Sequence, residues 1–209
     1  MFKKFTTEEN VSGKSQMKSS AQRQVRTKIE EQMPALVPNY IEQILPKKHK
    51  SILVKCSDYV SIICMQREHG KGDDSGDDDG DGKDQVVTIG DMQPLFFQLR
   101  DGPYIPSLRL LHMYPMMLPQ VQVDRGAIKH IMKGADIMCP GLTSAGANLG
   151  DKKIDENTIV AIMAEGKKHA VAIGRMKMSS DDIKSINKGI GVENVHFIGD
   201  GLWKITKLE

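Results

Sequence analysis

Three cations at four-residue intervals, Arg125, Lys129 and Lys133, are the residues with the clearest chemical potential in this chain. On a helix this spacing places the three side chains about one turn apart in succession, so that they face the same way. Guanidinium and ammonium groups in such a row bind the phosphates of a nucleic-acid backbone. A basic helix face that is merely solvated is the alternative interpretation of the same spacing.

The residues around these cations predict a short helix that leads directly into a buried strand. Asp124 can cap the start of the helix, and Gly134 can close it in the left-handed conformation. Residues 135–138 then read as a strand, which a turn at Pro140 and Gly141 ends. We expect Gly134, Pro140 and Gly141 to shape a contact loop in which the backbone amides near Gly134 can approach RNA, because no side chain intervenes there. The stripe predicted to face the core consists of Ala127, Ile128, Ile131 and Met132.

A basic helix, a glycine and a buried strand in this order resemble the PUA domain, a small β-barrel first described in pseudouridine synthases and archaeosine transglycosylases. The resemblance implies that the helix and the loop around Gly134 grip RNA, often the single-stranded CCA end of tRNA in relatives of this domain. Lys167 and Lys168, in a turn between two predicted strands, are expected to extend the basic surface. A lysine-rich turn that only aids solubility is the alternative for these two residues.

The overall charge conceals an internal asymmetry. The 209 residues carry a net charge of +2, but residues 70–91 hold eight Asp against two Lys, a balance of −6 that leaves +8 for the rest. The remaining chain is therefore basic, which favours partners that carry phosphates. Residues 70–91 are expected to form a mobile acidic loop, because they contain too few apolar residues to offset the entropy of ordering.

Composition and cysteine usage narrow the class of protein further. Three cysteines without paired spacing support neither a disulfide framework nor a zinc site. No segment approaches the ~18 apolar residues that a membrane helix needs, and no leader-like start is present. The chain is therefore expected to be cytoplasmic, with no membrane contact, no metal and no cofactor.

Periodicity and turn residues predict an α+β protein of two domains, residues 1–117 and 118–209, divided between Pro115 and Pro119. The first is an α/β domain with helices at 15–33, 38–45 and 107–113 and strands at 51–56, 59–65 and 95–99. The second is a PUA pseudo-β-barrel with strands at 121–123, 135–138, 158–164 and 170–177. A second helix there runs from Ser179 to Gly189, and strands 195–198 and 202–205 flank a hairpin turn at Asp200 and Gly201.

Two further patterns invite a chemical interpretation that the residues do not sustain. Cys139 beside Pro140 would need a nearby cation or base to act as a nucleophile, and a buried structural thiol is the simpler interpretation. Residues 77–82 match the first half of a calcium-binding EF-hand loop, but Thr88 stands where the bidentate Glu is needed. We therefore predict neither a catalytic residue nor a metal site.

A wider resemblance is carried by residues 2–5, 108–112, 137–144, 159–167 and 200–203. These segments together resemble the malignant T-cell-amplified sequence protein family over nearly the whole chain. Its members pair an N-terminal α/β domain with a PUA domain, and the acidic segment replaces what is a tight hairpin in the family. Such an insertion costs little, since closure entropy grows only logarithmically with loop length.

The family resemblance implies a non-enzymatic RNA-binding translation factor. Its expected partners are a density-regulated protein homologue, the small ribosomal subunit and the tRNA acceptor end, and its expected roles are ribosome recycling, reinitiation and non-canonical initiation. The alternative is an RNA-modification enzyme or its specificity subunit, which would use the PUA domain to present tRNA. A protein-binding adaptor with an incidental basic face is a third hypothesis.

Overall fold

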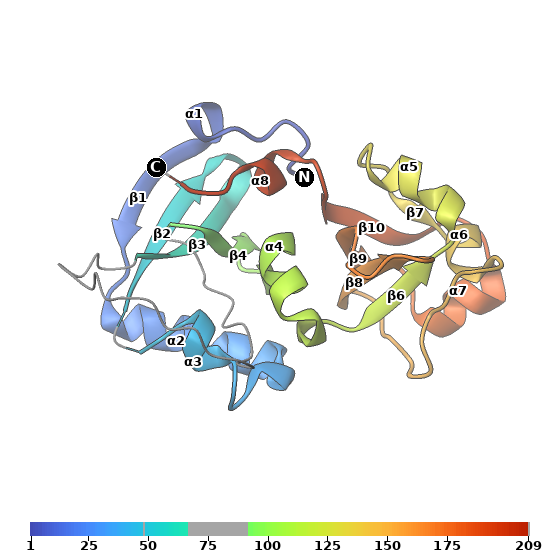
Figure 1. The fold of residues 1–209 in the computed structure, drawn as a ribbon, viewed down its shortest axis with the longest axis horizontal. Helices are drawn as coiled ribbons and strands as arrows, with labels where there is room; N and C mark the ends of the chain where they lie inside the picture. The colour runs from blue at the N-terminus through green and yellow to red at the C-terminus, as the bar shows by residue number, and fades with distance from the viewer. Residues whose placement is uncertain (48, 67–91, 209) are drawn as a thin grey trace, which may run out of the picture.

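The chain folds into two domains that lie side by side, as the computed structural model shows for residues 1–47, 49–66 and 92–208 (Figure 1). Each domain is built on a five-stranded sheet with short helices around it. The predicted α+β class is therefore confirmed. The predicted acidic loop at 70–91, and with it the EF-hand-like pattern, lies outside the described residues.

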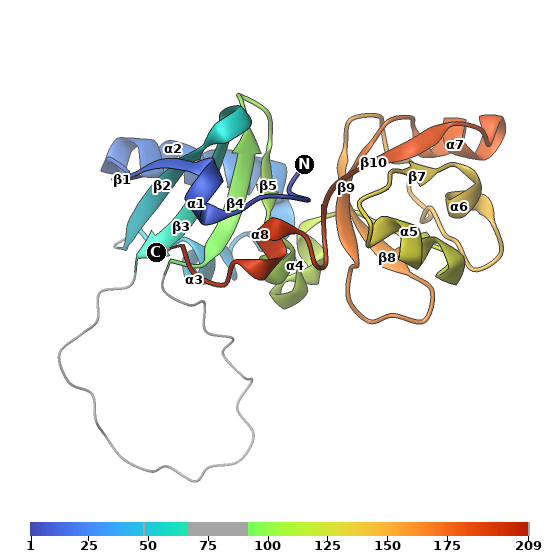
Figure 2. The same cartoon turned by 90° about the horizontal axis from the view of Figure 1, so that it is seen from above.

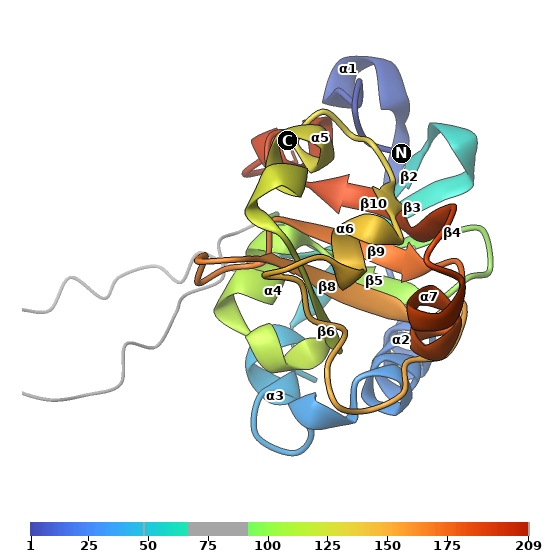
Figure 3. The same ribbon diagram turned by 90° about the vertical axis from the view of Figure 1, so that its right-hand side faces the viewer.

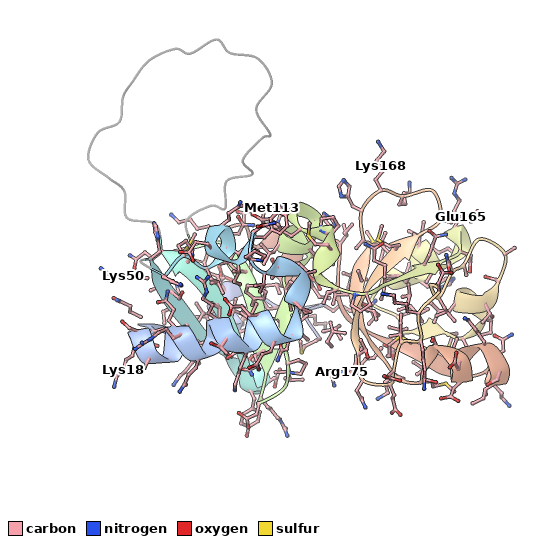
Figure 4. All side chains as sticks on the ribbon, turned by 90° about the horizontal axis from the view of Figure 1, so that it is seen from below. Lys18, Lys50, Met113, Glu165, Lys168 and Arg175 are labelled. Atoms are coloured by element: carbon pink, nitrogen blue, oxygen red, sulfur yellow. The ribbon has the colours of Figure 1, made fainter. Side chains whose placement is uncertain are left out.

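The N-terminal sheet is antiparallel, and its strands follow one another in chain order. Helix α2 runs across the sheet (Figure 4), and its Val25 and Ile29 are buried because residues four apart share one helix face. The strands are β1 (Val11–Gln16), β2 (Lys50–Cys56), β3 (Val60–Gln66), β4 (Pro94–Leu99) and β5 (Tyr104–Pro106). The helices are α1 (Thr7–Asn10), α2 (Ser19–Gln32), α3 (Ile41–Ile44) and α4 (Leu108–Met113).

The beginning of this domain differs from the prediction. The helix expected from Ser15 begins only at Ser19, and Val11–Gln16 forms the edge strand β1, in which Lys14 lies opposite Val54 of β2. All but the first of the β1 side chains are exposed, so the strand shows no alternation of apolar and polar residues. Backbone pairing with β2 creates β1, and sequence periodicity does not record that pairing.

The C-terminal sheet has the strand order β6-β8-β9-β10-β7, with a parallel pair at β6 and β8, and it curls into a half-barrel. Helices α5 and α7 lie on opposite sides of it in the end-on view (Figure 3). Its strands are β6 (Gln120–Val123), β7 (Ile137–Met138), β8 (Ile159–Ala164), β9 (Ala172–Met176) and β10 (Ile190–Phe197). The helices are α5 (Ile128–Ile131), α6 (Pro140–Thr143), α7 (Ser180–Ile186) and α8 (Gly201–Lys204).

Two predicted features of the C-terminal region are wrong. Helix α7 ends at Asn187, which takes the left-handed conformation with φ 47°, and not at Gly189. The strand expected after Asp200 is helix α8, because the Asp200 carboxylate accepts a hydrogen bond from the Trp203 N–H and caps a helix there. An Asp-Gly pair serves both as a hairpin turn and as a helix start, and only the following contacts decide between them.

Both ends of the chain pack at or near the junction of the domains. The buried ring of Phe2 meets Phe97 of β4 edge-on at 4.9 Å and His196 of β10 at 5.8 Å. The Gly201 N–H donates to the Phe2 carbonyl at 2.8 Å, and Leu208 is buried in the N-terminal core. Residues 200–208 thus leave the C-terminal sheet and rest against the N-terminal domain (Figure 2). No helix in the described ranges is long and apolar enough to span a membrane.

The N-cap of α4 offers a test of how this packing stabilises the protein. Ser107 is buried, and its Oγ accepts from the Leu110 N–H at 3.2 Å and donates to the Pro94 carbonyl at 2.8 Å. We expect Ser107→Ala to lower the free energy of unfolding by about 2 kcal/mol, measured by chemical denaturation, because the helix loses its cap and the Pro94 carbonyl loses its buried donor. Ser179→Ala removes the more exposed cap of α7 and should cost only about 1 kcal/mol. Equal losses in the two variants would contradict the argument from burial.

Candidate nucleic-acid interface

The basic helix begins at a well-supported cap. Oδ1 of Asp124 accepts hydrogen bonds from the N–H groups of Gly126 at 2.6 Å and Ala127 at 3.1 Å, as the sequence predicts. Oδ2 accepts from the Ser144 hydroxyl at 3.0 Å, and this bond ties the start of the helix to the segment after α6. The chain then makes a 3₁₀ turn at Arg125–Ala127 before α5.

The end of this helix is fastened to β10 by one buried amide. Nδ2 of Asn194 donates to the carbonyl oxygens of Ile131 and Ala135, each at 3.1 Å. The Asn194 N–H also donates to the Asp136 carboxylate at 2.9 Å. These bonds hold the turn around Gly134 in place, so the surface that carries the cations is anchored to the sheet.

Gly134 adopts the left-handed conformation, with φ 81°. A Cβ at this position would lie 3.0 Å from the ring of Phe197, so the chain needs a glycine here for both conformation and space. One part of the prediction is wrong. The amides of Lys133, Gly134 and Ala135 donate to the carbonyls of His130 and Ile131, which close the helix, so they are not free to contact RNA.

The predicted cationic side chains are all exposed to solvent. Arg125, Lys129 and Lys133 are exposed on or beside α5, and Lys167 and Lys168 are exposed in the turn after β8. Within the described residues, no ion pair engages any of these five side chains. Their charge is therefore available to a partner. That they bind RNA stays a prediction.

The structure brings Arg125 together with the turn after β8. A Cβ on Gly166 would lie 3.4 Å from Nη2 of Arg125, so the guanidinium rests beside this turn. The Arg125 N–H donates to the Glu165 carboxylate at 3.3 Å. The start of the basic helix thus lies beside the turn that carries Lys167 and Lys168, 40 residues away in the chain. We use the name α5 surface for the five predicted cations: Arg125, Lys129, Lys133, Lys167 and Lys168.

A pocket of about 580 Å³ opens beside the α5 surface. Predicted residue Gly141 lies on its wall, while Pro140, at the start of α6, is exposed beside it. Sequence reasoning missed the outer wall, where Met138 and Ile190 are 50% and 43% exposed. These two residues sit opposite each other on β7 and β10, so their apolar surface forms only when the strands pair. The remaining lining includes Asp124, Gly126, Ala127, His130, Ile131, Ala135, Asp136 and Ile137.

The pocket has largely apolar walls, and the helix that forms one of them also carries Lys129 and is preceded by Arg125. Such a site can take a flat base against Met138 and Ile190 while the neighbouring phosphates meet the side chains of Lys129 or Arg125. The Asp124 and Asp136 carboxylates are occupied by hydrogen bonds from the protein itself. The arrangement is suited to binding and orienting a nucleotide chain.

Cys139 is fully buried, and its Sγ lies 3.8 Å from the Met178 sulfur and donates to the Lys188 carbonyl at 3.4 Å. Burial raises the pKa of the Cys139 thiol, which disfavours the thiolate that a nucleophile needs. Among residues 1–47, 49–66 and 92–208, no three His, Cys, Asp or Glu side chains gather in a way that would hold a metal ion.

Comparison with known proteins agrees with this architecture. The PUA domain family matches residues 119–198, and the Pre-PUA-like domain family matches residues 5–70 and 81–115. Malignant T-cell-amplified sequence 1-A of Xenopus laevis is 45% identical to the chain, with 97% of each protein covered. The chain belongs to the malignant T-cell-amplified sequence family. Malignant T-cell-amplified sequence 2 of Homo sapiens is 44% identical to the chain, again with 97% of each protein covered. The Drosophila melanogaster homologue of sequence 1 is 43% identical, with 98% of this chain and 97% of the homologue covered.

Two archaeal structures share the fold of this family member. A hypothetical protein from Pyrococcus horikoshii superposes with a TM-score of 0.65 at 22% identity, covering 93% of this chain and 99% of its own. A PUA domain protein from Aeropyrum pernix has a TM-score of 0.61 at 19% identity, covering 92% and 89%. The predicted order of an N-terminal α/β domain and a C-terminal PUA domain is confirmed. Family and domain together support an RNA-binding, translation-related protein.

Proposed function

We propose that this protein is a non-enzymatic translation factor that binds RNA on the small ribosomal subunit. Its roles are release of tRNA and mRNA in ribosome recycling, reinitiation and non-canonical initiation. It works in the cytoplasm as a heterodimer with a density-regulated protein homologue. The C-terminal domain holds the single-stranded tRNA acceptor end, and the N-terminal domain supplies surfaces for the ribosome and the partner. In this proposal the protein positions RNA without changing its covalent bonds.

The α5 surface and its adjoining pocket carry this proposal. Arg125, Lys129 and Lys133 are exposed without ion pairs to described residues, and they lie on or next to the helix that forms one wall of an apolar pocket. A flexible single strand can satisfy both features at once. The carboxylates of the pocket already accept hydrogen bonds, so they have less need of a further donor. The pocket therefore favours a nucleotide whose base enters the pocket and whose phosphates remain at the protein surface.

The affinity for RNA should fall steeply with salt if cations neutralise the backbone. We expect the logarithm of the association constant for an unstructured oligoribonucleotide to fall against the logarithm of salt with a slope of about −3, which corresponds to about four phosphates on single-stranded RNA. Fluorescence anisotropy between about 50 and 300 mM KCl measures this slope. An RNA affinity that does not change with salt would show that the α5 surface is not the RNA-binding site.

The ribosomal role is tested by co-sedimentation with purified small subunits. The full chain and a variant that lacks residues 70–91 are each expected to sediment with the subunits, and reversal of Lys129 and Lys133 to Glu should release them. Finding neither ribosomal RNA nor the partner homologue with any of these proteins would overturn the proposed role.

An RNA-modification activity is the second hypothesis, and family membership alone does not exclude it. Incubation of the purified protein with tRNA, followed by nucleoside analysis, distinguishes the two. Unchanged nucleosides together with tight tRNA binding are expected for a positioning factor. New modified bases would support the enzyme.

A further inference from the structure

Four side chains from both domains contact one another in a row at the domain junction. Arg109 and His112 lie on α4, Trp203 lies on α8, and His169 precedes β9. The Arg109 Cζ is 4.4 Å from the centre of the Trp203 ring. The His112 ring centre is 5.4 Å from that of Trp203, and the two rings meet edge-on at 61°. The His112 ring centre is 5.0 Å from that of His169, with a tilt of 37° between the two imidazoles. We call this arrangement the stacked row.

Hydrogen bonds fix the inner members of the row. Nε and Nη2 of Arg109 donate to the Trp203 carbonyl at 3.1 and 2.8 Å. Nε2 of His112 lies 2.7 Å from the Ala170 carbonyl, and it must carry the proton because a carbonyl oxygen only accepts. Burial lowers the pKa of His112, so this ring stays neutral near pH 7. The row therefore presents a rigid, neutral ring beneath His169.

The outer member of the row is exposed and has cations beside it. His169 is exposed, and Lys167 and Lys168 precede it in the same turn. Lys168 projects from this turn on the same side of the molecule as Met113 of α4 (Figure 4). The turn also touches the Arg125 guanidinium at Gly166. His169 thus follows two lysines in a turn that also lies beside Arg125 at the start of the basic helix.

We propose that His169, supported by the stacked row, is a platform on which an unpaired RNA base stacks while Lys167 and Lys168 hold its phosphates. A single-stranded nucleic acid is the ligand class that brings a flat ring and regularly spaced negative charges together. This inference rests on the proposed RNA-binding function and adds a second contact, away from the pocket beside α5.

Binding of a single-stranded oligoribonucleotide of about 12 nucleotides with one 2-aminopurine tests the platform. We expect His169→Ala to weaken the affinity on the order of fivefold and to reduce quenching of the 2-aminopurine at one position along the oligonucleotide. His169→Phe keeps a flat ring and should retain both the affinity and the quenching. His49→Ala, an exposed histidine of the N-terminal domain, is the matched control and should leave both unchanged.

The outcomes separate this inference from the proposed function. Weak binding by His169→Ala together with rescue by His169→Phe supports the platform. If His169→Phe binds the oligonucleotide as weakly as His169→Ala, the platform is wrong. It is also wrong if His169→Ala binds with the affinity of the unaltered protein. Where reversal of Lys129 and Lys133 still weakens RNA binding, the α5 surface stands in either case. If the unaltered protein does not bind the oligonucleotide at all, both proposals fail.

Discussion

Reversing two charges on the α5 surface, Lys129→Glu with Lys133→Glu, is expected to weaken binding to single-stranded RNA by about 30-fold near 0.1 M salt. Both lysines are exposed and have no ion pair among the described residues. The reversal therefore changes the electrostatic potential at the surface and leaves the fold intact. The salt slope should change from about −3 to about −1.5, since each lost phosphate contact removes about 0.7 from it. Fluorescence anisotropy at several salt concentrations measures both quantities.

The N-terminal domain offers a matched control for this experiment. Lys14 and Lys18 are also exposed and four residues apart, but they lie in β1 and immediately before α2, in the other domain from α5. Lys14→Glu with Lys18→Glu makes the same change in net charge and should weaken binding by less than about threefold. Equal losses in the two double variants would mean that net charge alone attracts RNA. No loss in either would favour the protein-binding adaptor.

Removing the Asp200 carboxylate is expected to be the most destabilising of the substitutions considered. Oδ2 of Asp200 accepts from Nδ1 of His196 at 2.7 Å and from the Phe197 N–H at 3.0 Å, and Oδ1 accepts from the Trp203 N–H at 2.9 Å. Both side chains of the His–Asp pair are 1% exposed or less. Asp200→Ala leaves three buried donors without an acceptor, so the free energy of unfolding should fall by about 3 to 5 kcal/mol.

Thermal and chemical denaturation measure this loss, which corresponds to a fall in Tm of roughly 10 °C for a chain of this length. Asp200→Asn keeps the shape and one acceptor oxygen, and should lie between the original protein and Asp200→Ala. Asp181→Ala, on the exposed first turn of α7, is the control and should change stability by no more than about 0.5 kcal/mol. If Asp200→Ala is as stable as Asp181→Ala, the carboxylate does not support the junction as argued.

Features of the candidate site that depend on near neighbours were predictable from the chain. Asp124 caps the residues two and three positions ahead, and Gly134 closes the helix with a left-handed turn. Both are local events in which side-chain type decides the backbone conformation. The exposure of Lys129 and Lys133 likewise follows from the helical period of Ala127, Ile128 and Ile131, which pack on the core. The prediction that Met132 faces the core is wrong, since this residue is 37% exposed.

Features that depend on distant segments were not predictable in the same way. The apolar wall of the pocket needs Met138 and Ile190, which are 52 positions apart, to lie opposite each other. The stacked row needs α4, the turn before His169 and α8 to meet, although a helix at α8 was not expected at all. Nothing in the neighbourhood of His169 along the chain indicates a ring beneath it.

The residue pattern by itself determined the α+β class, most of the strands and helices, and the cations that face solvent, because apolar periodicity and capping act over a few residues. Tertiary structure alone decided the edge strand β1, helix α8 and the junction at which Phe2, His196 and Asp200 are buried together. The physical reason is that backbone pairing and burial are satisfied by whichever segment the fold brings near. A short sequence window holds no information about that segment.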